Sequence, residues 1–238
     1  MKKTFLGTMT DLLYPRRCPV CDRAVKPFGS LICETCKTEP VCIKEPFCMK
    51  CGKELADEET EYCSDCVRHV HIFDRGRALF AYKSMSDSIY RFKYKERREY
   101  AAYYAECIAH SLGEWIVRCN PDALVPVPIH SSKRYVRGYN QAEVLAKELG
   151  GILHIPVDGN LIERVRKTSP MKDLSASERQ NNLKRAFKIR CNDVKLNTVI
   201  IVDDIYTTGS TIDAMSYELR KAGVKQIYFV TLAIGKGL

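Results

Sequence analysis

The chain has 238 residues, of which 45% are hydrophobic and 28% charged, and its formal net charge is +9. This composition describes a soluble globular protein, and the length allows one sizeable core and a smaller module. A run of about 18 apolar residues, which a membrane-spanning helix needs, occurs nowhere in the sequence, so we expect no transmembrane segment. The basic balance suggests a polyanionic partner but locates no site for it.

Residues 1–14 carry two lysines followed by apolar residues at helical spacing. Thr8, Thr10 and Asp11 interrupt the apolar stretch and no small-residue cleavage site follows it, which argues against a signal peptide. We expect an amphipathic helix that packs on the protein itself, with binding to a membrane surface as the alternative. The protein is therefore expected to be cytoplasmic.

Four Cys-x-x-Cys pairs lie before residue 67, and the first two recur 30 residues later, so this segment is an internal repeat. The spacing is typical of zinc ligands, because each pair can turn two thiolates toward one ion and two pairs complete a tetrahedral site. We predict a double zinc ribbon with structural Zn²⁺, since redox-active dithiols would rarely occur four times in register. The predicted ligands are Cys18, Cys21, Cys33, Cys36, Cys48, Cys51, Cys63 and Cys66.

The spacing leaves the pairing open: neighbouring pairs can share an ion, or the two repeats can interleave. Cys42, His69 and His71 are spare potential ligands that we leave out of the sites. Because the cysteine-rich pattern stops near residue 70, we place a small zinc-ribbon domain at residues 1–70 and a second domain at residues 71–238.

A strand is predicted at residues 76–82 and a helix at 85–94. The helix ends in a stretch that interleaves basic and aromatic side chains, the combination that phosphate contacts and base stacking require. We predict a surface for single-stranded nucleic acid; the alternative is a solvated basic face whose aromatic rings turn to the core. The candidate residues are Arg91, Phe92, Lys93, Tyr94, Lys95, Arg97 and Arg98.

Helical periodicity returns at residues 100–118, followed by a buried strand at 124–128 and a helix at 139–149. Three cations lie between the strand at 124–128 and the helix at 139–149. If the ligand carries a diphosphate that leaves in a reaction, these cations can neutralise its charge. These cations are Lys133, Arg134 and Arg137.

The later part of the chain is predicted to contain a short strand at 152–157 and a final strand at 226–234, after a helix that ends at 218–223. The stretch 164–187 follows the strand at 152–157 and is polar, basic and poorly periodic in its first half. We expect a mobile lid there.

In the stretch 198–211, continuous β-branched residues lead into two acids and then into a hydroxyl-rich turn. This pattern predicts a buried parallel strand, a phosphate-binding loop and a helix. Asp203 and Asp204 stand at the strand's carboxyl end, where they can bind the hydroxyls of a phosphorylated ribose and its Mg²⁺. The 5′-phosphate is expected in the turn formed by Thr207, Thr208, Gly209, Ser210 and Thr211.

This motif resembles the phosphoribosyl-pyrophosphate (PRPP) loop of type I phosphoribosyltransferases, with Tyr206 in place of the usual small aliphatic residue. The resemblance implies an α/β fold with a parallel sheet flanked by helices, and Mg²⁺ with PRPP as the ligand. It makes Asp203 and Asp204 the catalytic pair. Those enzymes also have a flexible loop at the place of residues 164–187, which implies a lid that excludes water.

The whole chain is similar to the ComF family, also called ComFC, of competence proteins from naturally transformable bacteria. The resemblance implies a cytoplasmic protein for uptake of single-stranded DNA, working beside the ATP-dependent DNA translocase ComFA; partners could hold it at the inner face of the membrane. Met171 is a departure, because Gln is expected there in the lid. The similarity rests on the cysteine repeats and on Arg91-Phe-Lys-Tyr94, Pro126-Val-Pro128, Arg137-Gly-Tyr-Asn-Gln141, Arg179-Gln-Asn-Asn182 with Phe187, and Asp203-Asp-Ile-Tyr-Thr-Thr-Gly209.

Two functions are compatible with these residues. In the first, the chain is a DNA-uptake factor that binds single-stranded DNA on its basic surface. In the second, it is an active Mg-dependent phosphoribosyltransferase that moves ribose 5-phosphate from PRPP to an unidentified acceptor. We favour the first, because the sequence offers no identifiable residues that would read a nucleobase acceptor.

Overall fold

The computed structural model describes residues 15–27, 29–37, 42–165, 186–190 and 194–235. The helix expected in residues 1–14, and all but the two ends of the lid expected at 164–187, lie outside the described residues. No helix within the described ranges is both long and apolar enough to cross a membrane.

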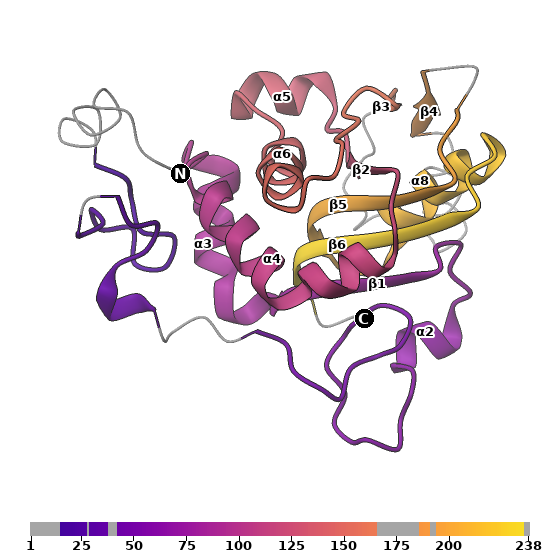
Figure 1. Cartoon of the computed structure of the whole chain (residues 1–238), viewed down its shortest axis with the longest axis horizontal. Helices are drawn as coiled ribbons and strands as arrows, with labels where there is room; N and C mark the ends of the chain where they lie inside the picture. The colour runs from indigo at the N-terminus through magenta and orange to yellow at the C-terminus, as the bar shows by residue number, and fades with distance from the viewer. Residues whose placement is uncertain (1–14, 28, 38–41, 166–185, 191–193, 236–238) are drawn as a thin grey trace.

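A four-stranded parallel sheet forms the centre of the molecule, in the order β1-β6-β5-β2 (Figure 1). Val199, Ile200, Ile201 and Val202 are all 0% exposed, as expected of a strand that is covered on both faces. The predicted parallel α/β sheet is therefore confirmed. Its strands are β1 (Arg75–Ala81), β2 (Ala123–Pro126), β5 (Thr198–Tyr206) and β6 (Gln226–Ile234).

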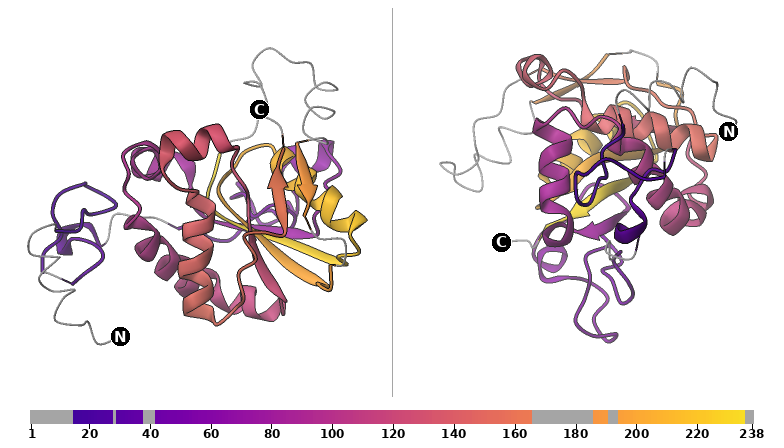
Figure 2. Two further views of the ribbon diagram at one scale, coloured as in Figure 1. Left: turned by 90° about the horizontal axis from the view of Figure 1, so that it is seen from above. Right: turned by 90° about the vertical axis from the view of Figure 1, so that its left-hand side faces the viewer.

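Separate hydrophobic clusters cover the two faces of the sheet, because successive residues of a strand point to opposite sides. Ile200 and Val202 belong to the cluster under α3, α4 and α6. Val199 and Ile201 belong to the other cluster, which includes α8. Figure 2 shows α6 and α8 on opposite sides of the strands. The helices are α3 (Tyr82–Tyr94), α4 (Tyr100–Arg118), α6 (Gln141–Leu153) and α8 (Ser210–Lys221).

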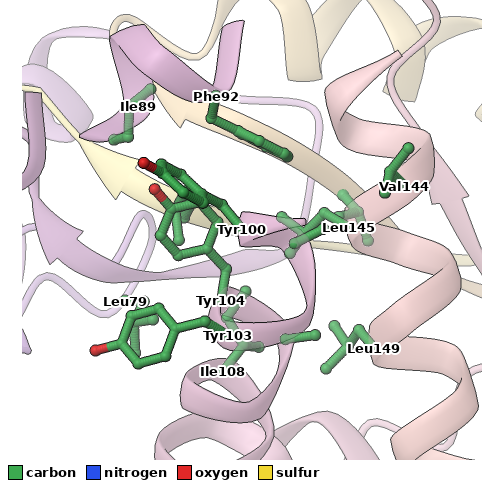
Figure 3. Packing of buried hydrophobic residues seen from close by; sticks show 14 of the residues in the cluster. Leu79, Ile89, Phe92, Tyr100, Tyr103, Tyr104, Ile108, Val144, Leu145 and Leu149 are labelled. Carbon is green, nitrogen blue, oxygen red and sulfur yellow. The ribbon is translucent and has the colours of Figure 1, made fainter. Parts of the chain in front are cut away.

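Aromatic rings dominate the cluster that joins α3 to α4 (Figure 3). The ring centroids of Phe92 and Tyr104 are 5.4 Å apart at an interplanar angle of 77°, and Tyr100 stands edge-on to Tyr104. All three side chains are 0% exposed. Edge-to-face pairs contribute about 0.5–1.5 kcal/mol beyond their buried area, so this packing fixes the position of α3.

The segment after β2 forms two helices where one was predicted. The short helix α5 (Ser131–Arg137) ends at Gly138, whose φ of 73° is left-handed. Asn140 then caps α6, because its side chain accepts a hydrogen bond from the backbone N–H of Ala142. The glycine and the cap together separate the basic helix α5 from the core helix α6.

The strand predicted at 152–157 is wrong for most of its length. Helix α6 continues to Leu153, and Val157 makes an isolated parallel bridge to Leu124 of β2. A two-stranded antiparallel sheet that the sequence did not suggest follows, formed by β3 (Ile162–Arg164) and β4 (Phe187–Ile189).

Candidate functional site

Two clusters of four cysteines lie on the molecule, and within each cluster the sulfur atoms are within 4.8 Å of one another. The pairing is local, so neighbouring Cys-x-x-Cys pairs share a site and the interleaved alternative is excluded. Four thiolates in a mostly buried cluster are the donor set of a closed structural Zn²⁺ site, and the residues therefore fit the metal. The clusters are Cys18, Cys21, Cys33 and Cys36, and Cys48, Cys51, Cys63 and Cys66.

The two ribbons repeat one backbone pattern. The antiparallel bridge between Arg17 and Ala24 in the first recurs as the bridge between Phe47 and Glu54 in the second. The residue that follows the first Cys-x-x-Cys of each ribbon has a left-handed φ, of 58° at Asp22 and 76° at Gly52. Figure 1 shows the ribbons apart, the first beside α3 and the second, with α2 (Ser64–Arg68), beside β1.

The first ribbon is held against α3 and α4 by charged side chains. Arg97 Nε lies 2.9 Å from an Asp22 carboxylate oxygen, and the Tyr100 hydroxyl donates to the same oxygen at 2.6 Å. Arg91 donates to the carbonyl oxygen of Val20 at 2.7 Å. Arg91 and Arg97 therefore bind protein groups, which corrects the expectation that both are offered to nucleic acid.

The predicted acids meet at the carboxyl end of β5. Asp203 is half-buried and Asp204 is 9% exposed, and the Asp203 carboxylate accepts a hydrogen bond from the backbone N–H of Asp204 at 2.8 Å. Burial raises the pKa of Asp203 to about 7, the Asp204 charge adds to this increase, and the ammonium of Lys93 opposes it. Two carboxylates whose charges act on each other favour a cation or a ligand hydroxyl nearby.

Cations from several elements surround this carboxylate pair. The ammonium of Lys93, from α3, lies 2.8 Å from Asp204 Oδ1, with both side chains largely buried. Burial lowers the pKa of Lys133, and so do the charges of Arg164, Arg137 and Lys93 around it. These side chains therefore form one electropositive cluster beside the acids, as a diphosphate site requires. The sequence did not suggest Arg164 or this position for Lys93.

Arg134, one of the three cations predicted to bind a diphosphate, pairs with a carboxylate of the protein instead. Its guanidinium lies 3.3 Å from a carboxylate oxygen of Glu143 on α6, and its side chain is 61% exposed. Arg137, one helical turn further on, donates to Gln141 and to the Tyr94 hydroxyl. Of the three cations on α5, Lys133 is near enough to Asp204 for that charge to act on its pKa, and Arg137 is near enough to Lys133 to lower its pKa.

The hydroxyl-rich turn after β5 leads directly into α8. Thr207 and Thr208 are exposed, and the Thr208 and Ser210 hydroxyls lie 2.8 Å apart. Gly209 has a left-handed φ of 77° and caps the helix, which turns the first backbone N–H groups toward the loop. The strand, turn and helix follow one another in the predicted order, with Thr211 as the second residue of α8. A helix N-terminus with flanking hydroxyls can bind a phosphate group.

Tyr206 and His71 pack against this loop, a contact that the sequence did not predict. A Cβ added at Gly209 would lie 2.6 Å from the Tyr206 hydroxyl and 2.9 Å from His71 Cε1. His71 is held by Asp213 of α8, with 2.7 Å between Nδ1 and Oδ2. Tyr206 stacks on Phe229 at 4.7 Å between centroids. The unusual tyrosine of the motif thus packs between the sheet and the segment that leaves the second ribbon.

Comparison with known proteins agrees with both halves of this architecture. Residues 9–67 match the double zinc ribbon domain, and residues 113–237 match the phosphoribosyl transferase domain. The chain is 33% identical to "Competence protein F" of Haemophilus influenzae over 91% of this chain and 96% of that protein. The chain belongs to the ComF family of competence proteins.

Other relatives carry related names. "DNA utilization protein YhgH" of Salmonella typhimurium is 30% identical, covering 88% of this chain and 86% of that protein. "Competence protein ComFC" of Bacillus subtilis is 24% identical, covering 76% of this chain and 74% of that protein. Membership of the ComF family supports a role in DNA uptake.

The basic stretch predicted to bind nucleic acid divides into buried and exposed parts in this ComF chain. Phe92 is 0% exposed and packs on Tyr104, so it cannot stack on a base, which corrects that prediction. Tyr94 is 53% exposed, and the guanidinium of Arg137 lies 4.7 Å over its ring. Lys95 and Arg98 are also exposed. Tyr94 follows Lys93, which pairs with Asp204, so this exposed member lies one residue from the contact with the acids.

Proposed function

We propose that this ComF chain is a DNA-uptake factor whose phosphoribosyltransferase pocket binds Mg-PRPP and whose pocket rim binds single-stranded DNA. One observation carries the proposal: consecutive residues of α3 belong to both surfaces. Lys93 forms an ion pair with Asp204 inside the pocket, while Tyr94 stands half exposed at the rim beside Arg137. A ligand in the pocket and a strand on the rim would therefore share the end of one helix.

The arrangement of charges supports Mg-PRPP as the pocket ligand. Asp203 and Asp204 would hold the ribose hydroxyls and the Mg²⁺, and residues 207–211 would hold the 5′-phosphate. Lys133 and Arg137 would hold the diphosphate. Because Lys93 already pairs with Asp204, it would compete with Mg²⁺ for that carboxylate.

The exposed face of α3 supports the binding of single-stranded DNA. Tyr90 and Tyr94 are 54% and 53% exposed, and their ring centroids are 5.2 Å apart. Such rings offer stacking surfaces, each contributing about 1–3 kcal/mol per base. Arg137, Lys95 and Arg98 supply positive charge for the phosphates beside them. We call Tyr90 and Tyr94 the tyrosine rim.

The names of the relatives, which refer to competence and DNA utilization, support the same role. From the family resemblance we further propose that the protein acts in the cytoplasm, beside the translocase ComFA. In that setting the rim would receive the incoming strand, and PRPP would regulate or accompany its binding.

Fluorescence anisotropy of a labelled single-stranded oligonucleotide, at two salt concentrations and with and without Mg-PRPP, tests the proposal. We expect salt-sensitive binding that Mg-PRPP alters, because both ligands use the end of α3. Changing Tyr90→Ala together with Tyr94→Ala should weaken DNA binding about tenfold or more. Tyr217→Ala, which removes a tyrosine that is 39% exposed from α8, is the control. DNA binding that the double change leaves intact would exclude the tyrosine rim.

A second candidate function is phosphoribosyl transfer itself. The raised pKa of Asp203, about 7, favours it, because a carboxyl group of that pKa can exchange a proton with an acceptor near neutral pH. Release of pyrophosphate from Mg-PRPP in the presence of candidate acceptors, absent from an Asp203→Asn variant, would support transfer. No release with any acceptor, alongside intact PRPP binding, would leave binding without turnover as the function.

A further inference from the structure

A cavity of about 300 Å³ opens at the edge strand β1. It lies between the leading segment of the second ribbon, the strand β1 and the helix α4. Strand β6 separates β1 from β5, which carries the carboxylate pair, so this cavity is distinct from the proposed PRPP site. Its walls include Ile43, Phe47, Arg77, Leu79, Leu112 and Trp115.

Arg77 is the cationic side chain in this cavity, and two aromatic rings hold it. Its guanidinium carbon lies 3.9 Å from the ring centroid of Phe47 and 5.5 Å from that of Trp115, within the range of cation–π contacts. The side chain is half-buried. Burial lowers the pKa of Arg77, with the charge of Arg75 adding to this decrease. The guanidinium is therefore fixed in place and partly removed from water.

The hydrogen-bonding capacity of this guanidinium is largely unused by the protein. It has five N–H donors, and the hydrogen bond that the structure gives it goes to the carbonyl oxygen of Gly76. Within the described ranges no carboxylate forms an ion pair with it. Glu45 lines the cavity but is exposed and does not neutralise it. A ligand that accepts hydrogen bonds in the plane of the guanidinium would complete the site.

We propose that this cavity is a binding site for a monocarboxylate with an apolar body. The planar carboxylate matches the two-pronged donor pattern of arginine. The apolar walls formed by Ile43, Leu79 and Leu112 suit a hydrocarbon portion, and the cavity has the volume of a small-molecule site. A phosphate dianion fits less well, because a single guanidinium balances one of its two charges and the Glu45 carboxylate repels a dianion more strongly than a monoanion.

The chain provides its own reporter for this site, since Trp115 is its one tryptophan. We would titrate the full chain with hexanoate, its uncharged analogue hexanamide, and inorganic phosphate while recording tryptophan emission. Hexanoate should change the tryptophan emission, and the change should saturate with hexanoate concentration. The bound carboxylate would neutralise part of the guanidinium charge beside the indole ring. Hexanamide and phosphate should bind at least about tenfold more weakly. An equal response to hexanamide, or a stronger one to phosphate, would overturn the proposal.

Variants locate the response. Arg77→Gln should abolish it, whereas Arg75→Gln removes an exposed charge from the same strand and should leave it unchanged. Ser111→Leu fills the cavity from α4 without touching the arginine, so it keeps the test decisive if Arg77→Gln unfolds. A saturable response that survives Ser111→Leu, or is absent from the unaltered chain, would refute the site. Binding of Mg-PRPP should be the same in all three variants.

Discussion

Lys93 and Asp204 form an ion pair 2.8 Å long that joins α3 to the end of β5. The side chains are 17% and 13% exposed, so the pair is shielded from most solvent screening. It attaches α3 to the carboxylate pair, although α3 also contacts the first zinc ribbon through Arg91.

Replacing this lysine tests whether it stands in for a metal ion. Lys93→Met should lower the free energy of unfolding by about 1–3 kcal/mol, because it leaves the carboxylates without their cation. Added Mg²⁺ should then raise the unfolding temperature of the variant more than that of the unaltered chain. Thermal unfolding with and without Mg²⁺ measures this, with the exposed Lys95→Met as control. If Mg²⁺ raises the unfolding temperature of both chains equally, Mg²⁺ does not take the place of the Lys93 ammonium.

The raised pKa of Asp203 predicts opposite effects of pH on ligand binding and on stability. An acid whose pKa is about 7 in the folded chain, above its usual 3.8, binds its proton more tightly when folded. Stability should therefore fall as pH rises from about 4 toward 7, while affinity for Mg-PRPP should rise as the carboxyl group ionises.

The Asp203→Asn variant separates these effects. It should bind Mg-PRPP poorly at every pH. At about pH 8 it should unfold at a higher temperature than the unaltered chain, because the unaltered chain then carries a buried negative charge at Asp203 that the variant lacks. Calorimetric titration at about pH 6 and about pH 8, together with thermal unfolding, checks both. A lower unfolding temperature for the variant at the higher pH would contradict the role of burial.

Gly209 should tolerate no side chain. Gly209→Ala combines a left-handed φ of 77° with a contact of 2.6 Å to the Tyr206 hydroxyl, so the loop must shift and Mg-PRPP binding should fall more than about tenfold. Gly223→Ala, at the other end of α8, has a φ of 96° but open space, and it should cost stability without affecting binding.

A second change distinguishes collision from backbone strain in the Gly209→Ala variant. Adding Tyr206→Phe removes the hydroxyl in that contact and should restore part of the Mg-PRPP affinity. No recovery would place the effect in the backbone conformation or in the remaining contact, 2.9 Å from His71 Cε1. Isothermal titration with Mg-PRPP gives the affinity in each case.

Removal of one zinc ligand tests the independence of the metal sites. Cys48→Ser should release the ion of the second cluster and keep that of the first, because the cysteines pair locally. Mg-PRPP binding should also weaken, since His71 behind the phosphate loop follows directly from the second ribbon. Metal analysis together with titration measures both, and loss of both ions would argue against independent sites.

The local parts of the fold were predictable because each lies in a continuous stretch of sequence. The four apolar residues from Val199 onward predicted a strand buried on both faces, and the Cys-x-x-Cys spacing predicted the zinc knuckles. The acids and the phosphate turn followed from their order along β5 and α8. Their roles toward PRPP, and the domain boundary near residue 70, stay predictions.

The contacts between distant parts of the chain were not predictable in this way. His71 and Asp213 are 142 residues apart in sequence, and only packing of the ribbon's exit segment on α8 brings them together. Phe92 and Lys93 are neighbours in a basic stretch, yet the helix turns one into the core and the other toward Asp204. Sequence alone gave both the same role because it does not show which way a helix faces.

The left-handed residue that follows the first cysteine pair of each ribbon explains how two copies of one sequence unit became specialised. Asp22 uses this position to bind Arg97 and Tyr100, whereas a Cβ at Gly52 would lie 2.9 Å from the backbone of β1. The first ribbon thus attaches to the sheet domain through the Asp22 side chain. The second lies close against β1 because Gly52 has no side chain. The duplicated units are no longer interchangeable, and a chain with its ribbons exchanged would bind the same metal but lose both attachments to the sheet domain.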